Sequence, residues 1–189
     1  MKIATLGWGS LLWDANPAFD QQHEDWLFDG PLLNLEFSRI SASRDDALTL
    51  VIDDTNGSPC TTAYAISKRR DPNDAICDLR SREGTILKRI GFWFADETRA
   101  CDLPVPVTVQ VWAGLHHIDV VIWTGLGSNF ADKVGELFTV EAAVQHIQGL
   151  EAAGKAKAAE YVWRAPAFVQ TPLREALDAQ PWFAPDNPK

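Results

Sequence analysis

A short glycine-containing segment near the amino terminus has the composition of a ligand-binding turn. Gly7 and Gly9 flank Trp8, and Ser10 and Leu11 follow them directly. Glycines allow a tight turn and close approach of a ligand, and exposed N–H groups in such a turn can hold an anionic or carbonyl oxygen. The same residues are also typical of an ordinary turn between a strand and a loop. The five residues from Gly7 to Leu11 are therefore candidate binding residues.

A carboxylate on the inner side of a predicted helix makes Glu83 the candidate general acid and base. Asp71 and the proline after it predict the start of this helix. One face then carries Ile76, Leu79, Arg80 and Glu83 at i, i+3, i+4 and i+7. Burial and the carbonyl ends of the last helical turn disfavour the charged form, so we expect a raised pKa for Glu83. An ordinary Arg80–Glu83 pair that closes the helix is the alternative interpretation.

Arg39 is a further candidate, because an arginine in a strand-like run can reach a substrate carboxylate. Arg44 follows five residues later and would point to the opposite face of a regular strand. The alternative is that both are surface arginines on an edge strand.

Other kinds of site fit the sequence poorly. His116 and His117, with Asp119, could suggest a metal site at the start of a predicted strand, but adjacent residues of a strand point to opposite faces, so the two imidazoles could not easily share one ion. Leu12 stands where a dinucleotide fingerprint needs its third glycine. A hydrolase or amidotransferase using Ser10 or a cysteine would lack a histidine partner. We therefore expect no metal and no cofactor.

The composition is that of a globular domain that binds neither nucleic acid nor membrane. The chain has 189 residues, 46% hydrophobic and 23% charged, and a formal net charge of −9 with no basic block to hold phosphates. The three cysteines form no C-x-x-C pair and read as free thiols of a reducing compartment. No apolar stretch is long enough for a membrane span, and no targeting segment is recognised, so we expect a soluble cytoplasmic protein. A small molecule or a protein is the expected partner, with the oligomeric state unknown.

The elements that position these residues are strands in the first two-thirds of the chain and helices at its end. The predicted strands are 3–6, 32–41, 47–52, 61–66, 105–113 and 117–124. After them, Thr139 is expected to cap a helix that Gly154 ends, and Thr171 opens another. Because a regular βαβ alternation is missing, the prediction is an α+β fold, a small mixed or antiparallel β-barrel with flanking helices. One domain is expected over residues 1–180, with a mobile tail at 181–189.

The order of these parts resembles the gamma-glutamylcyclotransferase-like superfamily, which includes the ChaC, AIG2-like and gamma-glutamylamine branches. That family has a strand leading into Tyr-Gly-Ser-Leu, and Trp8-Gly9-Ser10-Leu11 is similar to it. Its second signature is a helix that ends in Arg-Glu, which Arg82-Glu83 matches at a similar distance downstream. The resemblance covers residues 3 to 94.

The resemblance implies a cofactor-independent enzyme that cyclises a gamma-glutamyl amino acid, peptide or amine to 5-oxoproline and releases the amine. Glu83 would be the general acid and base, and the N–H groups of Gly9, Ser10 and Leu11 would hold the glutamyl part. Trp8 replaces the family tyrosine, and the Gly-Gly-Tyr of the glutathione-acting branch is absent after Glu83. The specificity of that branch therefore does not transfer, and a non-catalytic module that binds a metabolite or partner in the same pocket is the alternative.

Overall fold

The computed structural model describes residues 1–183, which form two compact units. The first unit comprises Met1–Leu33 and Thr61–Leu126. The second begins with Asn34–Cys60 and resumes at Gly127. The prediction of one domain over residues 1–180 stays a prediction.

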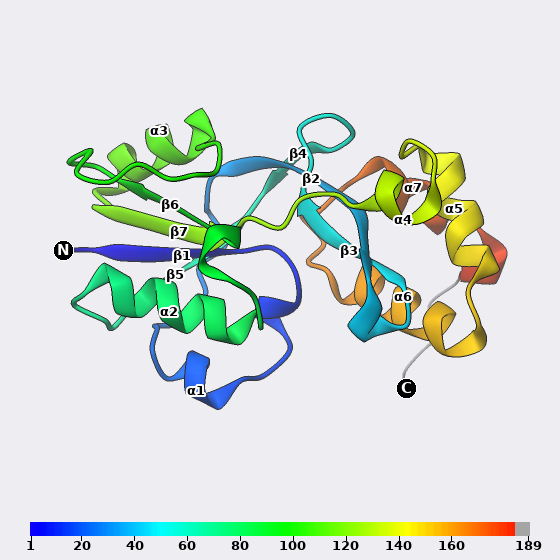
Figure 1. Cartoon of the computed structure of the whole chain (residues 1–189), viewed down its shortest axis with the longest axis horizontal. Helices are drawn as coiled ribbons and strands as arrows, with labels where there is room; N and C mark the ends of the chain where they lie inside the picture. Colours follow the sequence, from blue (N-terminus) through cyan, green and yellow to red (C-terminus); the bar gives the residue numbers. More distant parts are fainter. Residues whose placement is uncertain (184–189) are drawn as a thin grey trace. The chain divides into compact units, whose positions relative to one another are not determined.

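The first unit is a four-stranded sheet with helices on both faces (Figure 1). In spatial order its strands are β5 (Ala63–Ile66), β1 (Ile3–Gly7), β7 (Val120–Thr124) and β6 (Ile90–Phe94). The central pair β1 and β7 is parallel, and the two outer pairs are antiparallel. The helices of this unit are η1 (Ser10–Leu12), α1 (Pro17–Asp20), α2 (Pro72–Arg82), η3 (Leu87–Arg89) and α3 (Val107–His116).

Helix α2 begins and ends where its sequence predicts. The Asp71 side chain accepts a hydrogen bond from the Asn73 N–H at 2.9 Å, which caps the first turn. Gly84 follows the helix with a φ of +57°, the left-handed conformation that glycine adopts most easily. The end of this helix is therefore set by local chemistry.

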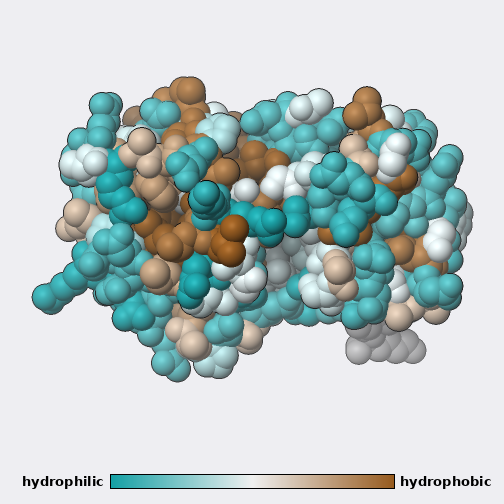
Figure 2. All heavy atoms as spheres, in the orientation of Figure 1, coloured by the Kyte–Doolittle hydropathy of each residue, from teal (hydrophilic) through white to brown (hydrophobic). Residues whose placement is uncertain are grey.

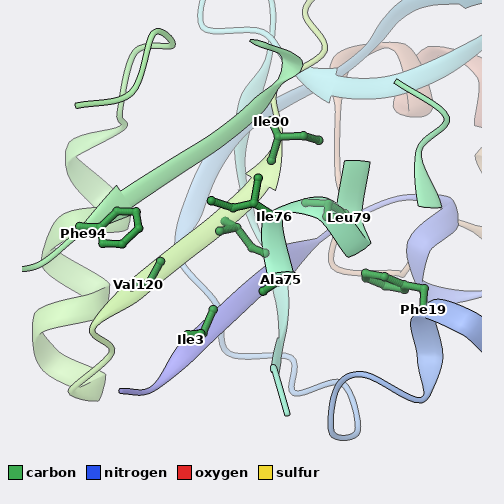
Figure 3. Packing of buried hydrophobic residues seen from close by; sticks show 9 residues of the cluster. Ile3, Phe19, Ala75, Ile76, Leu79, Ile90, Phe94 and Val120 are labelled. Carbon is green, nitrogen blue, oxygen red and sulfur yellow. The ribbon is translucent and has the colours of Figure 1, made fainter. Parts of the chain in front are cut away.

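The inner face of α2 packs on one face of the sheet and forms the core of the first unit (Figure 3). Leu79 is completely buried there, with Ile76 one turn earlier. The cluster consists of Ile3, Phe19, Ala75, Ile76, Leu79, Ile90, Phe94, Val120 and Ile122. Glu83 is one turn beyond Leu79 on the same helix, so this packing directs the end of α2 toward the end of the sheet.

The second unit is a three-stranded sheet with helices from the carboxyl-terminal third of the chain. Its strands, in spatial order, are β3 (Ala47–Ile52), β2 (Leu32–Ser41) and β4 (Ser58–Thr61). The helices are η2 (Ala42–Arg44), α4 (Phe130–Val134), α5 (Val140–Gly149), α6 (Ala152–Arg164), α7 (Pro172–Asp178) and η4 (Pro181–Phe183). The side chains of Thr139 and Thr171 cap α5 and α7, as predicted.

The α+β class is confirmed, whereas the predicted barrel is not found. The seven strands divide between two sheets, and neither sheet closes into a barrel within residues 1–183. None of the helices that these residues form combines the length and the apolarity needed to span a bilayer. Of the predicted tail at 181–189, the first three residues form η4 with Phe183 buried, and 184–189 lie outside the described residues.

The predicted strand at 105–113 is wrong, because this segment forms helix α3. Its valines alternate with polar residues, which is typical of a strand. Val109, Trp112 and Ala113 also recur at i, i+3 and i+4, and these are the residues that the fold buries. His117 ends the helix with a φ of 53°, so β7 starts at Val120 and not at 117.

The predicted end of the helix after Thr139 is also wrong. Helix α5 ends at Gly149, and Gly154 lies within α6. A Cβ atom at Gly154 would come within 2.6 Å of the Asp45 carbonyl oxygen. This glycine therefore allows close packing and does not stop a helix.

The outer face of α3 is apolar, and hydrophobic residues gather over this helix in Figure 2. Val107, Val111 and Leu115 recur every fourth residue and are all exposed. Helix α3 carries no Asp, Glu, Lys or Arg side chain. Its exposed face therefore contrasts with the charged surface expected for so acidic a chain.

Two buried carboxyl groups of the second unit respond in opposite ways to their surroundings. Glu36 is 0% exposed, and its two oxygens accept hydrogen bonds from the N–H groups of Phe37 and Leu173. Burial raises the pKa of Glu36 despite these bonds. Burial also acts to raise the pKa of Asp53, but hydrogen bonds from Ser38 and Asn56 outweigh it and lower that pKa.

The raised pKa of Glu36 predicts a loss of stability with rising pH. The unfolded chain ionises this group near an ordinary pKa of about 4.3, below the folded value, so folding is progressively disfavoured as the pH rises through the folded pKa. Glutamine cannot ionise. The unfolding free energy of Glu36→Gln minus that of the wild type should therefore increase with pH, as measured by urea unfolding at a series of pH values.

Asp53→Asn is the matched control, and its trend has the opposite sign. Because the folded pKa of Asp53 is lowered, the wild type should gain stability over this variant as the pH rises above the folded pKa. Parallel pH profiles for the wild type and Glu36→Gln would contradict the account of Glu36.

Candidate functional site

The carboxyl ends of β1 and β7 meet at one edge of the first unit's sheet. The two strands are parallel, and Thr5 pairs with Ile122. Gly7 and Thr124, each two residues further along, therefore lie at the same edge. Open α/β sheets bind ligands beyond the carboxyl ends of their parallel strands, so this edge is where a site is expected.

The segment after β1 forms a single 3-10 turn at this edge. The Leu12 N–H donates to the Gly9 carbonyl at 3.0 Å, which closes the turn. Ser10 and Leu11 begin the helix η1, so their N–H groups have no partner inside it. Binding of an oxygen by these two groups stays a prediction.

Gly7 and Trp8 are closely packed in the first unit. A Cβ atom at Gly7 would come within 2.9 Å of the Trp26 ring, so the space beside this glycine holds a tryptophan. Trp8 is 6% exposed and belongs to the hydrophobic core. The contribution of these two residues to substrate binding stays a prediction.

Arg82 connects the end of α2 to the turn. Its Nη2 donates to the carbonyl oxygens of Ser10 at 3.2 Å and Asp14 at 2.9 Å. Its Nη1 lies 3.9 Å from Oε1 of Glu83, and the side chains of Arg82 and Glu83 are 13% and 17% exposed. The structure thus brings Glu83 and Ser10 to the same guanidinium group.

The structure does not form the Arg80–Glu83 pair that the sequence suggested as an alternative. Its Nη2 donates to the Ser81 hydroxyl, whereas the ion-pair neighbour of Glu83 is Arg82. The spacing of i and i+3 favoured Arg80, but Glu83 is the C-cap residue of α2, and the backbone leaves the helix at Gly84. The Arg-Glu pair in the sequence was the signal that could have identified Arg82.

Several polar atoms in the last turn of α2, just after it and at the end of β7 are buried and have no hydrogen-bond partner among residues 1–183. They are Nε of Arg80, Nε of Arg82, Oγ1 of Thr85 and Oγ1 of Thr124. Thr85 comes two residues after Glu83, and Thr124 is the last residue of β7. Buried polar atoms are normally satisfied, so these groups are noteworthy. Neither threonine stands out in the sequence.

A groove of about 620 Å³ starts beside the turn. Its lining includes Leu11, Trp13, Asp14, His23, Asp25 and Trp26. Leu11 is the residue of the predicted turn that contributes to it, and Glu83 is not part of its lining. The groove therefore adjoins the turn on a side separate from the acid.

The remaining predicted residues lie elsewhere. Arg39 belongs to the second unit, where its Nη1 donates to the Gly127 carbonyl at 2.8 Å, and its role in binding stays a prediction. His116 is the last residue of α3 and stacks on Trp112 with ring centroids 4.9 Å apart. Within residues 1–183, no three His, Cys, Asp or Glu side chains gather as they would around a metal ion.

No protein-family model matches this chain, and a search of curated proteins finds no relative. The function is therefore argued from the residues and their geometry.

Arg82→Ala should loosen the turn after β1. Hydrogen bonds to a charged group contribute about 1.5–3 kcal/mol each. Because the neighbouring side chains relax around the shorter alanine, losing both bonds should lower the free energy of unfolding by about 1–3 kcal/mol. Hydrogen exchange of the amides at 10–14 should become faster than in the wild type. Arg89→Ala, at an exposed arginine of η3, is the matched control. Unchanged exchange at the turn would show that Arg82 does not hold it.

Proposed function

We propose that this chain is a cofactor-independent gamma-glutamylcyclotransferase-like enzyme. It would convert a gamma-glutamyl amino acid, peptide or amine to 5-oxoproline and the free amine. The observation that carries the proposal is the largely buried Glu83, which shares the Arg82 guanidinium with the carbonyl of the Ser10 turn. The gamma-glutamylcyclotransferase-like fold, with its pocket between the turn and Glu83, is part of the same proposal.

One carboxylate suffices for the proton transfers of this reaction. Ionised Glu83 takes a proton from the substrate's α-ammonium group, and the freed amine nitrogen attacks the γ-carbonyl carbon. The new C–N bond closes a five-membered ring and leaves a tetrahedral oxyanion. When that oxyanion collapses, the bond to the departing amine breaks, and protonated Glu83 returns the proton to the leaving nitrogen. The ring nitrogen, positively charged since the attack, gives up its second proton through the ionised Glu83 to the released amine, which departs as an ammonium ion. Atoms and charge then balance without a cofactor.

The turn would supply the positioning that this cyclisation needs. The N–H groups of Ser10 and Leu11 have no partner inside η1 and can donate to a carbonyl oxygen or an oxyanion. Holding the glutamyl chain folded brings the amine to its own carbonyl, and such preorganisation supplies a large part of a cyclisation barrier. Arg82 keeps these donors and Glu83 in one arrangement, because it contacts both segments.

A non-catalytic binding module is the second candidate. The observation that favours it is Trp8, whose side chain is buried and which replaces the family tyrosine. No phenolic hydroxyl is available at that position to bond a substrate. This candidate predicts saturable binding of a gamma-glutamyl compound without formation of product.

Glu83→Gln should abolish turnover. Glutamine keeps the shape of the side chain but cannot take up and return a proton, and positioned acid–base groups contribute about 10²–10⁴-fold to rate. The measurement is release of 5-oxoproline from a panel of gamma-glutamyl amino acids, peptides and amines, with kcat compared between the two proteins.

Glu136→Gln, at an exposed glutamate of the second unit, is the matched control and should turn over like the wild type. Equal rates for Glu83→Gln and the wild type would remove Glu83 from the mechanism. Binding without product by the wild type would favour the non-catalytic module.

A further inference from the structure

The ring of His23 is buried in the first unit, and its two nitrogens differ in their surroundings. The side chain is 8% exposed and contacts the rings of Phe19 and Trp26, with centroids 4.9 and 5.1 Å away. Nδ1 lies 2.6 Å from the Glu24 carbonyl oxygen, which can only accept, so Nδ1 carries a proton. In the neutral ring Nε2 is then an acceptor, and it has no hydrogen-bond partner within residues 1–183.

This unpartnered nitrogen lies beside a carboxylate that lines the groove next to the turn. Nε2 is 4.0 Å from Oδ1 of Asp20, which is too long for a hydrogen bond. The other oxygen of Asp20 accepts from the Asn16 N–H at 2.8 Å, which holds the carboxylate in place. His23 and Asp20 both line the groove of about 620 Å³, whereas Asp20 does not line the small cavity beside Thr5 that His23 also borders. The acceptor and the carboxylate therefore meet at the groove.

The charges and rings of the lining indicate a cationic ligand. Among residues 1–183, four carboxylates line the groove against one lysine, and they are Asp14, Asp20, Glu24 and Asp25 against Lys68. Trp13 and Trp26 also line it, and indole rings attract organic cations. Leu11, Leu12 and Ala15 add apolar surface on which a carbon chain can lie. The groove thus combines an excess of negative charge with aromatic and apolar walls.

An organic ammonium group fits these partners better than a metal ion does. In the part of the chain that the structure describes, no three His, Cys, Asp or Glu side chains gather as they would around a metal. An ammonium group needs only acceptors, so one N–H can donate to Nε2 of His23 while another pairs with the Asp20 carboxylate. Because Nε2 and Oδ1 are 4.0 Å apart, one nitrogen can lie about 2.8 Å from both.

We propose that this groove binds a primary ammonium compound with a short carbon chain. The ammonium group lies between His23 and Asp20, and the carbon chain lies against the apolar and aromatic walls of the groove. The site is additional to the proposed active site and does not depend on it, because Glu83 is not part of the lining. Its test therefore needs no turnover.

Titration with n-butylamine, followed by NMR, tests this site. At about pH 8, where alkylammonium groups keep their charge, n-butylamine should give saturable shifts of the indole N–H signals of Trp13 and Trp26. Tetramethylammonium has the charge but no N–H group, and n-butanol has no charge. Each should bind about ten-fold more weakly than n-butylammonium or worse, because each lacks a charged hydrogen bond.

Two variants remove the two acceptors separately. Asp20→Asn keeps an oxygen for the Asn16 N–H but removes the charge, so n-butylammonium should bind about ten-fold more weakly or worse. His23→Phe keeps an aromatic ring but lacks Nε2, and should weaken binding by a similar factor. Asp20 is 40% exposed, so Asp20→Asn should fold with the melting temperature of the wild type. Asp102→Asn, at an exposed aspartate of the first unit outside the groove, is the matched control.

Three results would overturn the site. One is a wild-type protein whose indole signals do not shift with n-butylamine. Another is equal affinity for n-butylammonium and tetramethylammonium, which would mean that no acceptor takes part. The third is undiminished affinity in the folded Asp20→Asn protein. Release of 5-oxoproline by a protein that gives any of these results would still support the proposed function, so the two proposals fail separately.

Discussion

The guanidinium of Arg82 is the group on which the arrangement of this site depends. It is largely withdrawn from water, so its Nη2 donor needs acceptors from the protein. The carbonyls of Ser10 and Asp14 supply them, and both lie in the segment that follows β1. Because Arg82 precedes Glu83 directly, satisfying the arginine also determines where the carboxylate lies. A requirement of folding thereby brings an acid to a turn with available N–H donors.

The elements predicted correctly from the sequence are those with local causes. The strand over 32–41 and the start of α2 at Asp71 depend on side-chain alternation and capping, which are readable from neighbouring residues. Helix α3 was missed because its valines follow a strand period, whereas Val109, Trp112 and Ala113 follow the helix period that the fold buries. The barrel was predicted wrongly because the parallel pairing of β1 with β7 joins segments far apart in sequence.

The sequence identified candidate residues by their chemical type, but it could not identify the residues that contact them. The residue types of the Gly7–Leu11 turn and the inward place of Glu83 were enough to name both as candidates. Arg82, Thr85 and Thr124 were missed, because an ordinary arginine or threonine gains significance only from what surrounds it in three dimensions. The contact of Gly7 with Trp26 could not be foreseen for the same reason. The raised pKa expected for Glu83 stays a prediction.

A crystal structure of the protein with 5-oxoproline tests the location of the site most directly. The account predicts that the lactam lies at the carboxyl edge of β1 and β7, with one oxygen about 3 Å from the amide nitrogens of Ser10 and Leu11. The lactam nitrogen should lie within reach of the Glu83 carboxylate. A lactam bound elsewhere on the chain, with this edge empty, would contradict the account.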